Sequence, residues 1–304
     1  MTRGNIFVAV QSNHRVPRLP SLFLLLLPLG LPAADSALKE QVGALFRERQ
    51  WPEAQAMLEK VVAAEPGNAE AWYYLGESFL NRDDAEHAVP PLEKAVNLAP
   101  DRGEYYVHLG DAYGLSAQHA GLFSKLGWAK KCKAAYEKAI ELNPKNIRAR
   151  EGLLQFCRQA PGFAGGGIDQ AYAQAAEIQK LDPVRGRLAY ADLYVSEKKF
   201  PEAFAMYDEV LKDTPDNYSA LYELGRLAAV TGEGLDRGLA ALQRCLTLPP
   251  PPDQPGAAPT EWRIGNILEK KGDRAGAKLA YEAALKSDPK FSQAAEALKK
   301  LNPN

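Results

Sequence analysis

Cysteine, histidine and methionine are scarce in this chain of 304 residues. It contains three cysteines, four histidines and three methionines. Cys132, Cys157 and Cys245 are far apart, and neither they nor the histidines have the spacing of a metal site. We expect the three thiols to be buried as small apolar groups rather than to be reactive. A disulfide between two of them is the alternative.

The chain also lacks a surplus of charge of either sign and a long hydrophobic run. Lys and Arg number 37 against 38 Asp and Glu, a formal net charge of −1. No basic surplus indicates a nucleic-acid partner, and no acidic tail is present. No stretch reaches the roughly eighteen apolar residues that a membrane-spanning helix requires, so no stable span is expected.

Motifs of catalysis and of nucleotide binding are missing as well. The stretch APGFAGGGID, residues 160–169, is rich in glycine but lacks the Lys and the Ser or Thr of a phosphate-binding loop. Asp169 would place a carboxylate where a phosphate would lie. No Gly-x-Ser-x-Gly motif occurs. The sequence therefore predicts a structural turn here, and neither catalysis nor a cofactor.

The N-terminal residues differ in composition from the rest. Residues 1–34 hold basic but no acidic residues, and an apolar run from Leu22 to Leu31 is followed by small residues. This order is typical of a secretory signal peptide cleaved near Ala33 or Ala34. We expect a periplasmic or secreted protein; an uncleaved anchor and a cytoplasmic protein are the alternatives.

What the sequence does contain is a repeat. Residues 71–100 read AWYYLGESFLNRDDAEHAVPPLEKAVNLAP, and the same spacing of small and large apolar residues recurs along the chain. The positions that define it are Trp72, Leu75, Gly76, Phe79, Ala88, Leu92, Ala95 and Pro100. The pattern resembles the tetratricopeptide repeat, a helix–turn–helix unit of about 34 residues. The small residues let two helices approach closely, and proline ends the second helix.

The resemblance implies an all-α fold, a right-handed solenoid of antiparallel helix pairs with about seven units and a C-terminal capping helix. The chain is also similar to a group of exported bacterial repeat proteins that have a comparable glycine-rich turn. The units are expected at residues 35–68 (degenerate), 69–102, 103–146 (with an insertion), 147–183 (with the glycine-rich insertion), 184–217, 218–252 and 258–291, with the cap at 292–304.

Two adjacent units are longer than the repeat. The third has about ten extra residues between Tyr113 and Cys132, which predict a second helix extended by nearly three turns, about 15 Å. The fourth has about five extra, the glycine-rich stretch. Both insertions fall in the turn within a unit, so they should be neighbours in space. Their exposed patch would comprise Phe123, Lys125, Trp128, Pro161 and Phe163. In the plainer alternative, the two aromatic residues Trp128 and Phe163 pack the turn.

A third irregularity is the proline-rich stretch PPPPDQPGAAP, residues 249–259. Four consecutive prolines favour an extended conformation. We expect a stiff spacer between two units rather than a ligand for another domain.

The resemblance further implies that the first helix of each unit lines a concave face that binds a partner. The candidate residues there are Tyr73, Tyr74, Glu77, Asn81, His108, Asp111, Gln155, Arg158, Tyr222, Arg226, Trp262 and Arg263. Aromatic, arginine and amide groups on one face suit a protein or peptide, although a plain solvated face is the alternative. The Lys–Asn pairs with which some members of the family hold a C-terminal carboxylate are missing.

Two functional hypotheses follow. The first is a non-catalytic protein-binding or peptide-binding scaffold or assembly factor in the bacterial cell envelope, with a partner that the sequence does not identify. The alternative is a protein that binds or processes an envelope glycan or small molecule through the insertion patch, for which Trp128 and Phe163 would supply stacking surfaces.

Overall fold

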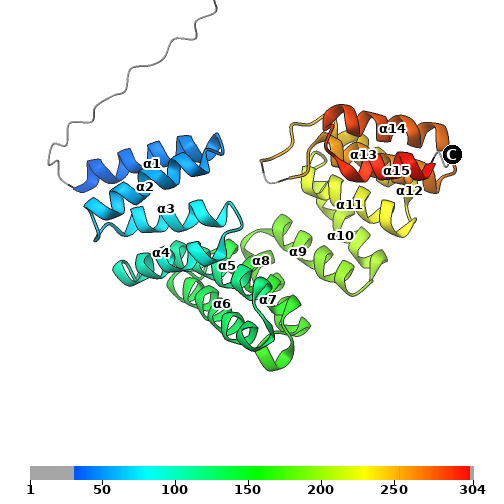
Figure 1. Ribbon diagram of the computed structural model, residues 1–304. Helices are drawn as coiled ribbons and strands as arrows, with labels where there is room; N and C mark the ends of the chain where they lie inside the picture. Colours follow the sequence, from blue (N-terminus) through cyan, green and yellow to red (C-terminus); the bar gives the residue numbers. More distant parts are fainter. Residues whose placement is uncertain (1–30, 253, 302–304) are drawn as a thin grey trace, which may run out of the picture.

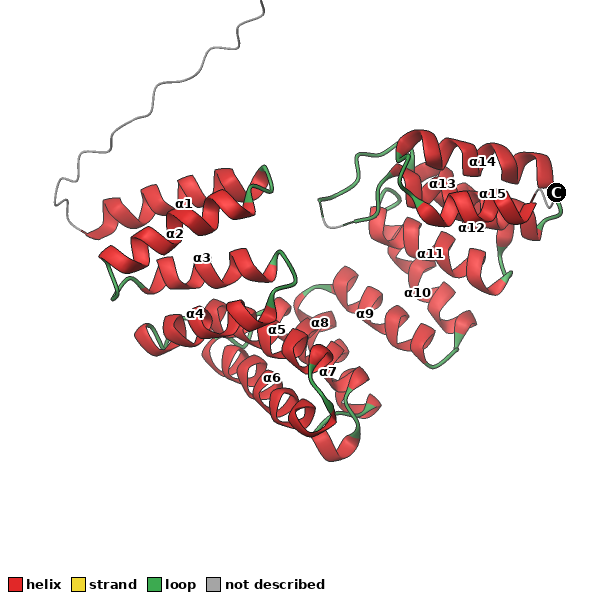
Figure 2. Cartoon of the chain, in the orientation of Figure 1, coloured by secondary structure: helices red, strands yellow, loops and turns green. Residues whose placement is uncertain are grey.

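The computed structural model describes residues 31–252 and 254–301, which form fifteen α-helices and one short 3-10 helix, with no strand in these ranges (Figures 1 and 2). The predicted signal peptide lies outside the described residues, apart from its last four, with which the first helix begins. The helices are α1 Leu31–Arg47, α2 Trp51–Ala64, α3 Ala69–Leu80, α4 Ala85–Leu98, α5 Gly103–His119, α6 Leu122–Leu142, α7 Ile147–Gln159, η1 Gly162–Ala164, α8 Ile168–Leu181, α9 Pro183–Ser196, α10 Phe200–Asp213, α11 Tyr218–Thr231, α12 Leu235–Cys245, α13 Ala257–Lys270, α14 Arg274–Ser287 and α15 Ser292–Leu301.

The helices are stacked in antiparallel pairs along an open arc (Figure 1). The first helix of one pair also touches the first helix of the next, as α3 touches α5 and α5 touches α7. The all-α solenoid predicted from the repeat is therefore confirmed. No helix in the described ranges is long and apolar enough to cross a membrane.

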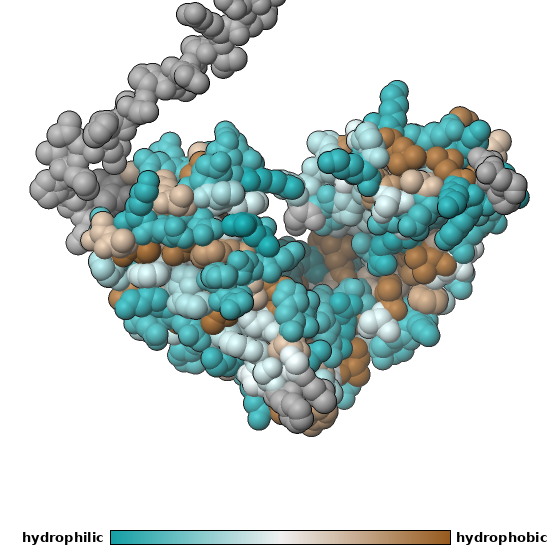
Figure 3. Space-filling view, viewed as in Figure 1, coloured by the Kyte–Doolittle hydropathy of each residue, from teal (hydrophilic) through white to brown (hydrophobic). Residues whose placement is uncertain are grey.

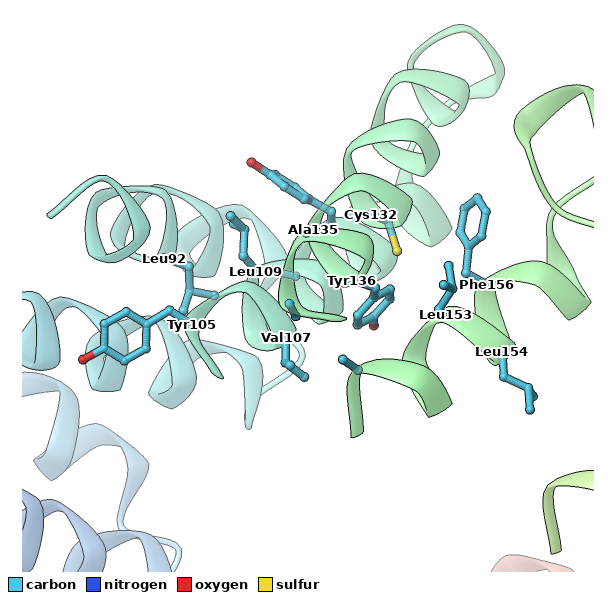
Figure 4. Close-up of a cluster of buried hydrophobic side chains, with 14 of the residues drawn as sticks. Leu92, Tyr105, Val107, Leu109, Cys132, Ala135, Tyr136, Leu153, Leu154 and Phe156 are labelled. Carbon is cyan, nitrogen blue, oxygen red and sulfur yellow. The ribbon is translucent and has the colours of Figure 1, made fainter. Parts of the chain in front are cut away.

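Buried side chains form a series of linked clusters rather than one central core. Helix α9 shows the linkage, because Leu193 belongs to one cluster and Ala191 to the next. Figure 4 shows the cluster around α5, α6 and α7. Since each pair of helices packs mainly on its neighbours, a change within one pair need not disturb distant pairs.

Glycines in the first helices allow the close approach within a pair. A Cβ atom on Gly76 would lie 2.4 Å from Leu92, and one on Gly110 would lie 2.7 Å from the ring of Tyr136. Both distances are far below van der Waals contact, so a side chain at either position would push the second helix away. The glycine at this repeat position is thus a packing requirement.

Side-chain caps and prolines set the helix boundaries. Asn68, Asp84 and Asn146 each accept a hydrogen bond from a backbone N–H in the first turn of the following helix. Asp182 ends α8 and caps α9 at once, with Pro183 as the first residue of α9. The prolines therefore end the second helices as predicted.

The proline-rich link between α12 and α13 is held at one point. The Tyr218 hydroxyl donates a hydrogen bond to the Pro255 carbonyl, at 2.5 Å. The link is thereby tied to α11, which fits a spacer, and its role as a ligand stays untested.

Two glycine substitutions test this packing. Gly110→Ala should lower the free energy of unfolding by about 1–3 kcal/mol, because the methyl group overlaps the Tyr136 ring. Gly127→Ala, in an exposed part of α6 with nothing within 4 Å of the added carbon, should raise it by about 0.5–1 kcal/mol. Urea unfolding followed by circular dichroism measures both. Equal effects of the two changes would contradict the packing role.

Candidate functional site

A cavity of about 810 Å³ opens between α3, α5, α6, α7 and the turn at η1. It lies on the part of the arc where α5 and the longest described helix, α6, pack together. Figure 3 shows the surrounding surface, which is mostly polar on both arms, with hydrophobic patches in the hollow between them. The volume of the cavity lies in the range of about 300–1,000 Å³ that is typical of ligand-binding sites in proteins.

The cavity joins two surfaces that were predicted separately from the sequence, the concave face and the insertion patch. Groove residues predicted from the repeat line one part of it, and insertion residues line the other. The predicted residues in its wall are Glu77, Asn81, His108, Asp111, Gln155, Lys125, Pro161 and Phe163. The concave face and the insertion edge are thus one continuous surface here.

The cavity owes its depth to the lengthening of one helix pair. α6 has 21 residues against 14 in α4, and α5 has 17 against 12 in α3. The prediction that the second helix alone is extended by nearly three turns is wrong. The chain reverses at Ala120 and Gly121, both in extended conformation, so the extra residues are shared between the two helices.

The glycine-rich stretch closes the cavity on the side of α7 and α8. The insertions of the third and fourth units are neighbours as predicted, since α6 contacts η1. A Cβ on Gly165 would lie 3.0 Å from Lys133 Nζ. Gly165 and Gly167 have φ angles of 85° and 136°, which favour glycine. A Cβ on Gly166 would lie 2.1 Å from the carbonyl oxygen of Ala160.

The same stretch is not a phosphate site. The N–H groups of the three glycines donate to Gly162, Pro161 and Cys157 carbonyls, respectively, at 2.9, 3.2 and 2.7 Å. Since these donors are used inside the turn, none is left to hold an anion. Asp169 lies in the first turn of α8. The structural turn read from the sequence is confirmed.

Tyr136 forms much of the boundary between the cavity and the core. Its ring fits between Gly110 and Gly152, and a Cβ on Gly152 would lie 2.3 Å from it. Its hydroxyl donates to Asp111 Oδ1 at 2.6 Å, and Arg148 binds the other oxygen of Asp111 at 3.1 Å. Burial by the helices, with the nearby Asp111 charge, raises the pKa of the Tyr136 hydroxyl. It stays protonated and holds Asp111 in place.

Two titratable groups beside this pair are shifted from their usual pKa. His108 is 3% exposed, and its burial, with the nearby Arg148 charge, lowers its pKa from 6.5 to about 4. Burial raises the pKa of Glu77. His108 Nε2 lies 3.9 Å from Glu77 and 3.5 Å from the Tyr73 hydroxyl, and its Nδ1 lies 3.3 Å from the Glu104 carbonyl. The imidazole is therefore neutral near pH 7.

The aromatic residues of the two insertions have different surroundings. Trp128 packs on Tyr113 at 5.7 Å between ring centres, and Lys131 lies over both rings. It is not among the residues that line the cavity. Phe163 lines the cavity and is 81% exposed. Packing of the turn thus explains Trp128 and does not explain Phe163. The side chain of Phe123 lies outside the described part.

The remaining candidate residues do not line this cavity. Tyr73 and Tyr222 are buried rather than exposed on the concave face, and Tyr74 packs against Phe46 and Tyr73. Other members are held by neighbours on the same face. Arg158 binds Asp192, Arg226 binds Glu223, and the Arg263 guanidinium lies 4.3 Å from the centre of the Trp262 ring.

Several cavity residues were not predicted as site residues. Cys132 was expected only as a buried thiol, Leu115 and Gln118 belong to the inserted segment, and Tyr136 and Phe156 were not among the predicted site residues. A signal for Tyr136 did exist, because glycines flank it in the two adjacent first helices. All three cysteines are free and buried, and burial raises the pKa of Cys132 and of Cys245 to about 12. The burial of the three thiols is confirmed. No cluster of metal-ligating residues occurs in the described ranges.

Comparison with known families identifies the fold. Two family models described as tetratricopeptide repeat match the chain, one at residues 40–113 and 188–251 and the other at 116–146 and 262–291. The chain belongs to the tetratricopeptide repeat family. Residues 147–187, which include the glycine-rich turn, lie between the matched ranges.

Known proteins match over part of their length. The chain is 26% identical to the human DnaJ homolog subfamily C member 7 over 53% of this chain and 33% of that protein. It is 22% identical to the human mitochondrial import receptor subunit TOM70, over 68% of this chain and 28% of that protein. The chain thus spans a third or less of these curated relatives.

A solved structure has the same fold over almost its whole length. A tetratricopeptide repeat protein from Parabacteroides merdae superimposes with a TM-score of 0.59 at 16% identity, covering 88% of this chain and 99% of that one. At this identity the likeness concerns the fold alone.

The buried imidazole predicts a pH dependence of stability. The unfolded chain binds a proton at His108 near pH 6.5, whereas the folded chain binds it only near pH 4. Stability from this group is therefore present above pH 6.5 and is lost as the pH falls toward 4, by about 3 kcal/mol. His108→Gln should remove this component.

Urea unfolding of both proteins at neutral pH and near the lower pKa gives the measurement. Glu77, Glu104, Asp111 and Arg148 face the imidazole and also contribute to the pH profile, so the test is the difference between the two proteins. Equal losses on acidification would show that His108 does not carry the effect.

Proposed function

We propose that this protein is a non-catalytic scaffold that binds a protein or peptide on its concave face, with the cavity as the main anchoring point. The observation that carries the proposal is the cavity itself. It combines carboxylate groups and an apolar wall in one recess, on the face that the repeat architecture leaves open. Such a recess can receive side chains of a partner that lies along the groove.

The named relatives support a binding role. One is a DnaJ homolog and another is a receptor subunit for mitochondrial import. A receptor subunit is by its name a binding protein, which fits a binding role for the repeat array of this chain. In this chain the ranges matched by the family models make up most of the described residues.

Capture of a partner's C-terminal carboxylate does not fit the groove. Tyr73 and Val107 occupy positions where a carboxylate-binding repeat would place a cation, and both are buried. Glu77, which has no cation within salt-bridge distance in the described ranges, then adds negative charge that repels a carboxylate. The partner therefore binds through other groups.

The alternative hypothesis, a glycan or small-molecule ligand bound at the insertion patch, does not fit the structure. That hypothesis depended on Trp128 and Phe163 acting together as stacking surfaces. Tyr113 and Lys131 pack on the Trp128 ring, and Trp128 does not line the cavity. Phe163 does line it. The two rings do not share a site.

We further propose that the scaffold acts in the bacterial cell envelope. The proposal is supported by residues 1–34, with their basic start, apolar run and small residues. The first described helix begins at Leu31, so cleavage near Ala33 or Ala34 would leave most of α1 on the mature protein.

Photocrosslinking tests the binding face. A photoreactive residue at Phe163 and another at Asn81, on opposite sides of the cavity, should crosslink to the same partner in cells of the source organism. The same residue at Leu279, which is 67% exposed on α14, is the control and should not crosslink to it. Crosslinks to that partner from Leu279 and from neither cavity position would contradict the assignment.

N-terminal sequencing tests the location. Protein from the envelope fraction should begin just after Ala33 or Ala34, because a signal peptidase removes the preceding residues. A full-length chain in the cytoplasmic fraction would contradict the proposed export and would leave the binding face unaffected.

A further inference from the structure

The α3 side of the cavity holds a carboxylate without a cation. Glu77 is 23% exposed, and the nearest group that could carry a positive charge is His108 at 3.9 Å, which is neutral near pH 7. The Tyr73 hydroxyl donates a hydrogen bond to Glu104 Oε1 at 3.4 Å. Arg148 is the nearest permanent cation, and Asp111 binds it. No cation in the described ranges therefore lies within salt-bridge distance of Glu77.

Asp83 adds a second negative charge to the wall of the cavity. This residue lines the cavity at the turn that follows α3, is exposed, and forms no ion pair in the described part of the chain. Carboxylates farther along the concave face differ, because Glu151 binds Arg185 and Asp192 binds Arg158. Uncompensated negative charge is thus concentrated at this side of the cavity.

The opposite side of the cavity is apolar. Leu115 of α5, Leu126 of α6 and Phe156 of α7 line it together with the exposed ring of Phe163. Phe163 has 81% of its surface in water, so a partner that covers it gains the free energy of burying a large apolar side chain. Lys125, the cation on this wall, disfavours a second positive charge here.

The distance between the two sides sets a spacing. His108 marks the acidic side on α5 and Leu115 marks the apolar side, seven residues farther along the same helix. At 1.5 Å per residue this separation is about 10 Å. An extended chain advances about 3.3 Å per residue, so about three residues span it.

From these observations we infer that the cavity binds an extended peptide segment that has a lysine or arginine about three residues from a large aliphatic or aromatic residue. The cation lies against Glu77, with Asp83 as a further negative charge in the wall, and the apolar side chain lies against Leu126 and Phe163. This inference rests on the proposed binding function and names the chemistry of the partner. Charge complementarity at one side and cover for an exposed ring at the other both support it.

Selection from a phage-displayed library of random 12-residue peptides on the full chain tests the inference. Enriched peptides should share a lysine or arginine about three residues from Leu, Ile, Met or Phe. One enriched peptide, synthesised with a fluorescent label, then serves as the probe in fluorescence polarisation. Its affinity should fall at least tenfold for Glu77→Gln combined with Asp83→Asn, and at least tenfold for Phe163→Ala.

Matched variants control for general effects. Glu86→Gln removes an exposed carboxylate on α4, and Leu279→Ala removes an exposed apolar side chain on α14. Both should leave the affinity unchanged. A probe with methionine in place of its basic residue should bind the original protein weakly and should no longer distinguish the Glu77 and Asp83 variant. Thermal melting followed by circular dichroism verifies that every variant is folded.

Two results overturn the inference in different ways. If enriched peptides bind but show no basic residue, or bind the Glu77 and Asp83 variant equally well, the inference is wrong and the scaffold function stands. If no peptide is enriched above a blank surface, the inference fails together with the peptide-binding function from which it is drawn.

Discussion

The contact of the Tyr136 ring with two glycines is the constraint on which the cavity depends. Gly110 in α5 and Gly152 in α7 leave a slot that any side chain would fill, and the ring occupies it from α6. Three helices are thereby held at close distance by one side chain (Figure 4). The hydroxyl then fixes Asp111, which holds Arg148. Apolar packing and the polar wall of the cavity thus have a common origin.

The repeat architecture explains why this region can depart from the regular pattern. In a solenoid each pair of helices packs on its neighbours alone, so a longer pair projects beyond them without disturbing the stack. α5 and α6 lengthen along their own axes, and the added turns form one wall of the cavity. The glycine turn of the next pair forms the facing wall. Residues 147–187, outside the ranges matched by the family models, belong to the same region.

Much of the fold could be predicted from the sequence, because the spacing of small and large residues reflects helix packing directly. Leu75, Gly76, Ala88 and Leu92 are buried as that spacing requires. The length of α5 could not be read in the same way. Gly114, directly after Tyr113, is a candidate helix stop, yet α5 continues through it to His119. The apolar spacing of the following residues fits a single long second helix as well as two shared extensions.

The cavity was harder to predict than the helices, because it depends on distances between elements. From the sequence, the groove and the insertion edge were predicted as separate surfaces. In the structure the extension of α5 beyond the length of α3 joins them. His108 was expected on an exposed face but is buried, and it lies 3.5 Å from the Tyr73 hydroxyl. Phe163 was placed in an exposed patch, with packing of its own turn as the alternative. That turn closes through backbone hydrogen bonds and leaves the ring in water.

The uncompensated charge of Glu77 has a cause in the repeat itself. Glu77 and Asp111 occupy equivalent positions, each directly after the glycine that meets the second helix, Gly76 or Gly110. Asp111 is neutralised by Arg148, which lies four residues before Gly152 in the next unit. Four residues before Gly110 the chain has Tyr106 instead of a cation. The equivalent ion pair cannot form there, and the carboxylate is left facing the cavity, where a partner's positive charge would complete the pairing that the repeat makes internally one unit later.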